Sequence, residues 1–234
     1  MKKALKNTAS ECIDEKIRQT HAIILSKPQL RELIDTIHDI PKIYKGRGKI
    51  KVIVIGQDPT IINKASRKNI TTALDLDKPG KLQRYIFSVC ENLGIDPLEE
   101  LYATNLFKNF FEQPPTFPSD VLGKFFEFWF PILKEEIALF PDIPVITLGN
   151  NLLDFLTVDK ADKCVRQYWG YTEDWKIGAS LPFKHILPEE NLLGRTVFPF
   201  PRQPSYLRQF FTDRCKSYIE YVKSNMIIAP HEAA

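Results

Sequence analysis

The stretch KVIVIGQDPT, residues 51–60, decides the fold. Its apolar part, residues 52–55, is a continuous run of β-branched residues, which is typical of a strand covered on both faces and therefore of a parallel sheet. The run ends at a glycine and is followed at once by Gln57 and Asp58. In an open parallel sheet, ligands bind in the crevice beyond the carboxyl ends of the strands. The stretch therefore predicts a buried strand that delivers a carboxylate to such a crevice.

Outward from this stretch, apolar strand patterns alternate with helical periodicity. The alternation predicts an α/β protein, a three-layer α/β/α sandwich around a small, mainly parallel four-stranded sheet. Pro131 is expected to break or bend the longest of the later helices. The other predicted strands are residues 101–107, 144–149 and 196–200, and the predicted helices are residues 79–95, 119–140, 150–156 and 205–225.

Length and composition indicate one domain that spans residues 1–234, because 44% hydrophobic residues can fill a substantial core. Residues 1–45 are expected to form a helical N-terminal extension packed on that domain, with two helices separated at residues 26–28. Residues 160–195, rich in Trp, Tyr, Gly and Pro, are interpreted as an inserted loop or hairpin.

The net charge and the positions of the cysteines bear on which partners, metal sites and cellular location the sequence predicts. The net charge of +3 neither demands nor excludes a polyanionic partner. The four cysteines lie far apart and form no Cys-x-x-Cys pair, which argues against a metal site and favours free thiols in a reducing cytoplasm. No stretch has the length and apolarity of a signal peptide or a membrane span. The sequence thus predicts a soluble, cytoplasmic monomer without a membrane partner.

Three polar clusters fall at the carboxyl ends of predicted strands: GQDPT at 56–60, Thr104-Asn105, and PRQPSY at 201–206. Each cluster alone has an ordinary structural explanation as a turn or, at Ser205, as a helix cap. Because the carboxyl ends of parallel strands meet at one edge of the sheet, we expect the three clusters to converge there. The sequence therefore predicts one composite site.

The same clusters carry a family resemblance. GQDPT, residues 79–115 (PGKLQRYIFSVCENLGIDPLEELYATNLFKNFFEQPP), VITLGNNLLDFL at 145–156 and QPSYLRQFF at 203–211 occur in this order. Together they resemble the uracil-DNA glycosylase superfamily over about residues 49–215, with a motif layout nearest to its thermostable iron–sulfur branch. The resemblance implies hydrolysis of the bond between uracil, or a related deaminated base, and deoxyribose in DNA.

The resemblance also implies roles around the base. Asp58 would serve the hydrolytic water and face the sugar cation, and Asn105 would read the base edge. The backbone near Gln57 would contact a carbonyl of the base. Thr60 would lie beside the 5-position of the pyrimidine. Leu74 is the nearest candidate for the stacking residue.

Further roles concern DNA and the leaving base. Gln203 would hold the leaving carbonyl, Ser205 would bind a backbone phosphate and Leu207 would act as the wedge that replaces the flipped base. Arg208 is expected to be a further DNA contact, and a basic rim is expected to include Lys64 and Arg67.

The sequence departs from the family pattern at four positions. Gln203 stands where the family has a histidine, and Thr60 where its best-known branch has a tyrosine. Leu74 is a poorer stacking platform than an aromatic residue. Asn109 occupies the position of a cluster cysteine in the thermostable branch, so we expect no iron–sulfur cluster and no other cofactor. Two alternatives to a glycosylase stay open: a weakly active or inactive nucleic-acid-binding protein of the same fold, and an enzyme that acts on free nucleosides.

Overall fold

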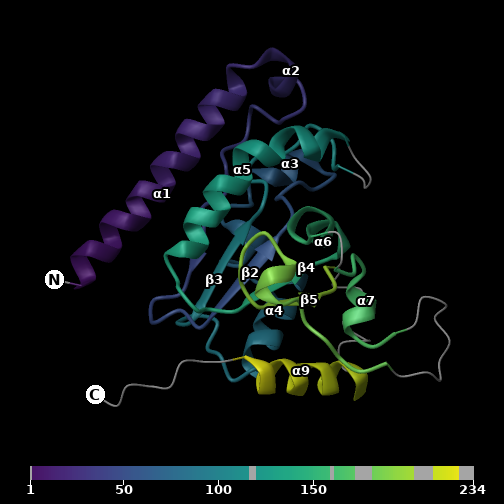
Figure 1. Ribbon diagram of the computed structural model, residues 1–234. Helices are drawn as coiled ribbons and strands as arrows, with labels where there is room; N and C mark the ends of the chain where they lie inside the picture. The colour runs from purple at the N-terminus through teal and green to yellow at the C-terminus, as the bar shows by residue number, and fades with distance from the viewer. Residues whose placement is uncertain (1, 116–119, 159–160, 172–180, 203–212, 227–234) are drawn as a thin grey trace.

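The computed structural model of the protein describes residues 2–115, 120–158, 161–171, 181–202 and 213–226. These residues form a central β-sheet with helices on both of its faces (Figure 1). The fold is therefore of the α/β class with three layers, which confirms the class predicted from the alternation of strands and helices.

Within these ranges the sheet has five strands in the order β1-β3-β2-β4-β5, and only the β1–β3 pair is antiparallel. The central strand is β2, and all of its residues are buried, as its continuous apolar run predicts. Gly56 lies opposite Asn105 in the register of β2 and β3, so two of the polar strand ends meet at one edge. The strands are β1 (Tyr44–Lys45), β2 (Val52–Gly56), β3 (Leu101–Asn105), β4 (Val145–Leu148) and β5 (Val197–Phe200).

The four-stranded sheet expected from the sequence is one strand short of the sheet observed in the described residues. β1 was missed because it has two residues and lies in a basic, glycine-containing segment without an apolar run. Its pairing is tertiary: Tyr44 lies opposite Ala103 of β3. Such a short edge strand leaves no periodic pattern that a sequence can reveal.

The helices divide between the two faces of the sheet. α5 and α6 lie on one side, and α4 and α9 lie on the other (Figure 1). The rings of Phe126 in α5 and Phe155 in α6 stack with their centroids 5.4 Å apart. The helices are α1 (Lys2–Leu25), α2 (Pro28–Arg31), α3 (Lys64–Arg67), α4 (Lys81–Asn92), α5 (Asp120–Ala138), α6 (Asn150–Leu156), α7 (Val165–Tyr168) and α9 (Asp213–Asn225), with 3₁₀ turns η1 (Ala73–Asp75) and η2 (Pro188–Glu190).

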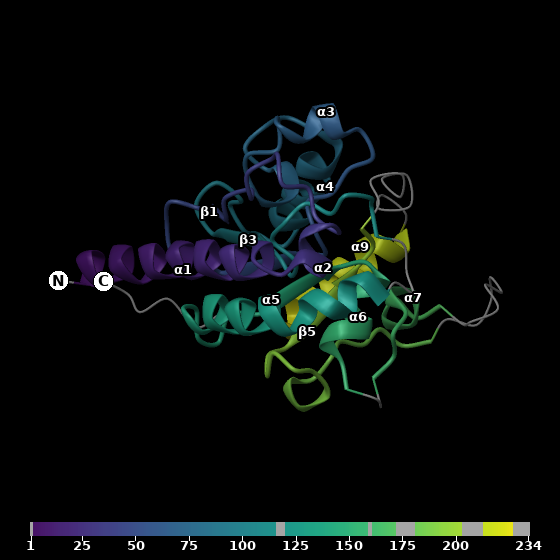
Figure 2. The same cartoon turned by 90° about the horizontal axis from the view of Figure 1, so that it is seen from above.

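The N-terminal helix α1 lies alongside α5, outside the sandwich (Figure 2). Its buried isoleucines, among them Ile17 and Ile24, join the core. The second helix expected before residue 40 is only the single turn α2. It ends early because the carboxylate of Asp35 accepts the backbone N–H groups of Ile37 and His38, which holds the chain in a turn.

α5 continues through Pro131 as one helix, so of the two expected effects, a break or a bend, the break is wrong. Trp129 and Leu133, on either side of the proline, are fully buried, and this packing outweighs the local cost of proline in a helix. None of the helices in the described ranges is long and apolar enough to cross a lipid bilayer.

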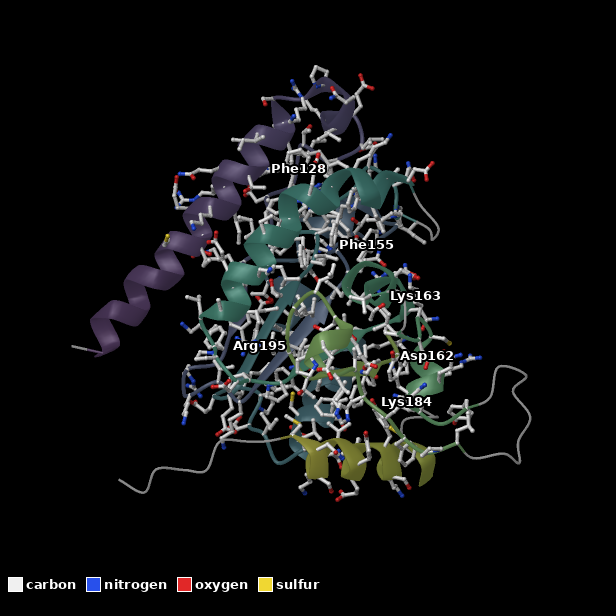
Figure 3. All side chains as sticks on the ribbon, viewed as in Figure 1. Phe128, Phe155, Asp162, Lys163, Lys184 and Arg195 are labelled. Carbon is white, nitrogen blue, oxygen red and sulfur yellow. The ribbon has the colours of Figure 1, made fainter. Side chains whose placement is uncertain are left out.

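The segment expected to be an inserted loop or hairpin has more structure than the sequence indicates. It contains α7 and η2, and an ion pair joins Lys184 to Asp162 (Figure 3). Ile186 forms an isolated antiparallel bridge with Val197, the first residue of β5. The parts described thus pack against the edge of the sheet.

Candidate active site

A cavity of about 480 Å³ opens at the carboxyl ends of the parallel strands. This size lies within the range of small-molecule sites, and the position is where an open parallel sheet places its ligands. Four parts of the chain form most of its wall: the turn after β2, η1, the start of α4, and the ends of β4 and β5. The lining residues include 56–61, Leu74, Asp75, 80–83, Leu148 and Arg202.

Asp58 is held in this wall by its neighbours in the turn. Its Oδ1 accepts the backbone N–H of Thr60 over 2.8 Å, and its Oδ2 accepts an amide N–H of Gln57 over 2.7 Å. The side-chain oxygen of Gln57 in turn accepts from Nδ2 of Asn151, at the start of α6, over 2.6 Å. Only 5% of Asp58 is exposed. The carboxylate therefore lines the cavity in one fixed orientation.

The environment shifts the protonation of Asp58. Burial raises the pKa of the carboxyl above its ordinary value of 3.8, because the charged form loses its hydration. The positive charge of Arg202 and the hydrogen bonds from Thr60 and Gln57 act in the opposite direction and offset burial only in part. A carboxylate with a raised pKa in a cavity is suited to accept a proton, and such groups are enriched at catalytic sites.

Asn105 lies directly behind the cavity floor. It is 3% exposed, it faces Gly56 across β2 and β3, and its Oδ1 has no hydrogen-bond partner among the described residues. A buried acceptor without a partner costs about 1–3 kcal/mol. The missing side chain at Gly56 leaves room for this buried oxygen, because a Cβ there would lie 2.4 Å from it. The amide is thus positioned to accept a donor from a bound molecule.

Replacement of Gly56 by alanine is expected to destabilise the protein by about 1–3 kcal/mol. The added Cβ would lie 2.3 Å from Cδ2 of Leu74 and 2.4 Å from Oδ1 of Asn105, so both must shift. Gly123 is the matched control: it lies inside α5 and an added Cβ would meet nothing within 4 Å. Gly123→Ala should stabilise the helix by roughly 0.5–1 kcal/mol. Urea unfolding of both variants measures the difference, and equal effects would contradict this account of Gly56.

Leu74, the expected stacking residue, does line the cavity. It and Asp75 are consecutive non-glycine residues with left-handed backbone, at φ 60° and φ 53°. This conformation is costly for a side chain as large as leucine, and such strain is concentrated at functional sites. Thr60 also lines the cavity, and its Oγ1 accepts the backbone N–H of Phe111 over 2.8 Å. The Thr60 hydroxyl therefore joins the turn after β2 to the segment after β3.

Arg202 is the residue that sequence reasoning missed. It lines the cavity at the end of β5 and its charge acts on Asp58. The sequence feature that could have pointed to Arg202 is its position directly before Gln203 in the PRQPS cluster. Gln203 itself and the predicted DNA-contact residues Ser205, Leu207 and Arg208 lie outside the described residues.

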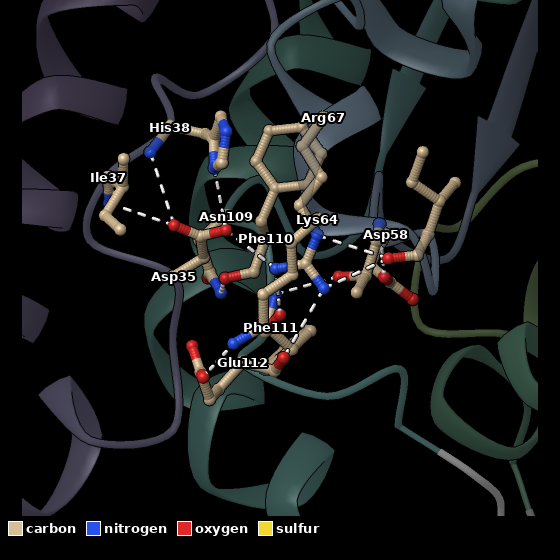
Figure 4. Close-up of polar contacts among 12 residues, drawn as sticks. Asp35, Ile37, His38, Asp58, Lys64, Arg67, Asn109, Phe110, Phe111 and Glu112 are labelled. Atoms are coloured by element: carbon tan, nitrogen blue, oxygen red, sulfur yellow. Dashed lines mark hydrogen bonds and ion pairs between the residues drawn. The ribbon is translucent and has the colours of Figure 1, made fainter.

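The prediction that Arg67 contacts DNA is wrong. Its side chain is fully buried and pairs with Asp35 over 2.7 Å (Figure 4). The guanidinium also donates to the backbone carbonyls of Ile61 and Phe111 over 3.0 and 2.8 Å. It therefore braces the turn that follows Asp58. Lys64, from the same predicted rim, is exposed and pairs with Glu112, and its contact with DNA stays a prediction.

The position that corresponds to a cluster cysteine in the thermostable branch has an ordinary structural use. Asn109 is buried, and its Oδ1 accepts the indole N–H of Trp129 over 2.7 Å. In the described ranges, no group of three or more His, Cys, Asp or Glu side chains could hold a metal ion. Lys108 is buried beside Glu136 over 2.7 Å, which is an internal ion pair.

Four of the predicted site residues, Gln57, Asp58, Thr60 and Leu74, thus share the cavity wall, and Asn105 lies behind its floor. In comparisons with known proteins, no family model and no curated protein matches this chain. The arrangement of a buried carboxylate, a cation and an unpartnered amide must therefore be interpreted on its own chemistry.

Proposed function

We propose that the protein is a DNA glycosylase of the uracil-DNA glycosylase superfamily, which hydrolyses the N-glycosidic bond of uracil or a related deaminated base. One observation carries the proposal: a buried carboxylate, Asp58, and a guanidinium, Arg202, line one cavity of suitable volume, and the buried acceptor of Asn105 next to Gly56 has no partner among the described residues. Cleavage of this bond builds positive charge on the sugar and negative charge on the pyrimidine. A site with both charges on its wall complements that transition state.

Asp58 has two roles in this reaction. As the C1′–N1 bond breaks, its electron pair leaves with the base, and the carboxylate stabilises the cation that forms on the sugar. Water then adds to C1′, and its proton passes to the carboxylate of Asp58. The hydrogen bonds from Thr60 and Gln57 keep the carboxylate in place during both steps. The base anion takes up a proton from solvent and Asp58 returns its proton to solvent, so the products are the free base and an abasic deoxyribose.

Asn105 selects the base. Its Oδ1 accepts the ring N–H of uracil, and its amide N–H groups donate to the neighbouring carbonyl. Cytosine presents an acceptor where uracil presents that N–H, so it would leave Oδ1 unpartnered. Gly56, which has no side chain, leaves room for Oδ1 of Asn105 and for the side chain of Leu74, which would lie 2.4 and 2.3 Å from a Cβ there.

Arg202 supplies positive charge to the departing base, directly before Gln203, which stands at the position of the family histidine. Gln203 is neutral, and the guanidinium is permanently charged with several donors in one plane. A charge-assisted hydrogen bond to the leaving carbonyl is about twice as strong as a neutral one. We therefore assign to Arg202 the stabilisation of the base anion.

The proposal is tested by incubating the protein with an oligonucleotide that holds one uracil, in single-stranded and double-stranded form, and treating it with alkali. Strand scission at the uracil, and none in the matched thymine oligonucleotide, is the expected result. Absence of scission on both forms contradicts the proposal. Salt-dependent DNA binding without base release would instead favour a nucleic-acid-binding protein of the same fold. Release of base from free nucleosides alone would favour an enzyme that acts on free nucleosides.

Arg202→Met is expected to lower kcat by about 100-fold to 1000-fold, because one charged donor to the developing charge is lost. It also removes the charge that lowers the pKa of Asp58, so that pKa rises further. Since the carboxylate form is the active one, the acidic limb of the profile of kcat/KM against pH should move to higher pH. Arg195→Met is the control. Arg195 (Figure 3) lies before the first residue of β5, whereas Arg202 lies after its last residue, so the two arginines are at opposite ends of the strand. A profile that stays at the wild-type pH would contradict the role of Arg202.

A further inference from the structure

A chain of two side-chain amides connects Asp58 to the start of α6. Nε2 of Gln57 donates to Oδ2 of Asp58 over 2.7 Å, and Oε1 of Gln57 accepts from Nδ2 of Asn151 over 2.6 Å. Gln57 is 2% exposed and Asp58 is 5% exposed, so water has little access to the bond between them. The Gln57 amide is therefore engaged by protein groups through both its nitrogen and its oxygen.

This chain of hydrogen bonds has a chemical direction. An ionised carboxylate only accepts hydrogen bonds, so the part of the Gln57 amide that meets Asp58 must be its NH₂ group. The oxygen of the same amide then needs a donor, which Asn151 supplies. Without that donor the buried oxygen would lose its partner, and the amide would be free to turn and accept from a protonated Asp58. Loss of the Asn151 amide therefore favours the protonated carboxyl.

Asn151 reaches Gln57 because of the order of the strands. Asn151 is the second residue of α6, which follows β4, and β4 is the parallel neighbour of β2. The turns after these two strands therefore lie at the same edge of the sheet. The preceding residue, Asn150, has a different use, because its Oδ1 accepts the backbone N–H of Val165, the first residue of α7, over 3.0 Å. Two adjacent asparagines thus hold two different parts of the protein.

We propose that Asn151 is a positioning residue, which fixes the orientation of the Gln57 amide and thereby keeps Asp58 ionised. The consequence for catalysis rests on the proposed function, in which the carboxylate faces the sugar cation and takes a proton from water. Asn151 acts through Gln57 and not on the substrate. Its loss should therefore change the pH dependence of the reaction, which a purely structural residue would not do.

The direction of that change follows from the environment of Asp58. Burial raises the pKa of Asp58, and the hydrogen bond from Gln57 lowers it, so loss of the bond raises the pKa further. Three other charged groups line the cavity. They are Arg202, whose charge also lowers the pKa of Asp58, and Asp75 and Lys81, from η1 and α4. All three stay in place when Asn151 is replaced, so the change reports on the amide chain.

The test compares Asn151→Ala with Asn150→Ala on a uracil oligonucleotide, with kcat/KM measured against pH. In Asn151→Ala the acidic limb should move to higher pH, so that on this limb kcat/KM is about 10-fold lower than in the wild type at the same pH. Asn150→Ala, the matched control, should keep the wild-type limb even if it is less stable. In a Gln57→Leu background, Asn151→Ala should add less than about a twofold change, because the chain is already broken. An undiminished effect in that background would contradict the proposal.

A second readout needs no catalysis. The ¹³C resonance of the Asp58 carboxyl, identified by its absence in Asp58→Asn, is titrated in the free protein. Its midpoint should lie at higher pH in Asn151→Ala than in the wild type and be unchanged in Asn150→Ala. An unchanged midpoint in Asn151→Ala, or equal changes in the two variants, would overturn the role of Asn151. If the midpoint moves as expected but the wild type releases no uracil, the proposed function fails and the control of Asp58 by Asn151 stands.

Discussion

Asp58→Asn is expected to abolish release of uracil, with kcat/KM reduced by about 1000-fold or more. The variant keeps the size of the side chain but removes both its charge for the sugar cation and its capacity to take a proton from water. Strand scission after alkali measures the loss. Asp142→Asn is the control, because Asp142 is exposed and precedes β4, at the edge of the sheet away from the cavity.

The same substitution should leave stability nearly unchanged at neutral pH. Because burial raises the pKa of Asp58 in the folded protein, the ionised form is more favourable in the unfolded chain. The group therefore reduces stability as pH rises from its unfolded value near 3.8 through its folded pKa. Asn removes that penalty and loses part of the hydrogen bonding, so the free energy of unfolding at pH 7 should change by less than about 1 kcal/mol. A large loss of both activity and stability would mean that Asp58 is structural.

Asp35→Ala is expected to destabilise the protein by about 3–5 kcal/mol, the largest effect on stability predicted here. The change leaves the guanidinium of Arg67 buried without its counter-ion. It also removes the acceptor for the N–H groups of Ile37 and His38. Glu112→Ala is the control: it breaks only the exposed pair with Lys64, which should cost less than about 1 kcal/mol. Similar losses in the two variants would contradict a central role for the buried pair.

The carboxylate of Asp35 also makes the free energy of unfolding depend on pH in the acidic range. Burial raises the pKa of Asp35, but hydrogen bonds from the Ile37 N–H, Arg67 and His38 outweigh it and bring the pKa down to about 2. The unfolded chain therefore binds the proton more readily, and stability is lost as pH falls from about 4 to about 2. Over this window wild type should lose about 2 kcal/mol that Asp35→Ala lacks. Denaturant unfolding at a series of pH values measures the difference, and parallel pH curves would contradict it.

The buried strands of the sheet could be predicted from the sequence. The short edge strand β1, which forms only by pairing with a distant strand, could not. The runs of β2, β3, β4 and β5 are apolar because both of their faces are covered, so their positions were readable. β1 depends on contacts with distant residues, such as Ala103 for Tyr44. Local sequence carries no signal for those contacts. Packing around Trp129 likewise overrides the helix-breaking tendency of Pro131.

The candidate site shows the same division. Asp58 could be predicted because a polar cluster after a buried strand points to the carboxyl edge of the sheet, whereas Leu74 was proposed only from the family resemblance. Arg67 was wrongly assigned to DNA because the sequence does not show which residue in a basic segment is buried. Its burial depends on an ion pair with Asp35, which lies far away in the chain. Arg202 was missed because its proximity to Asp58 arises only when β5 joins the sheet.

The most direct test of the account is a crystal structure of the protein soaked with uracil. The account predicts one ring in the cavity, with its N–H on Oδ1 of Asn105, Leu74 against its face and the carboxylate of Asp58 on the side that the sugar would occupy. An empty cavity at saturating uracil, or a ring bound away from both Asp58 and Asn105, would contradict it.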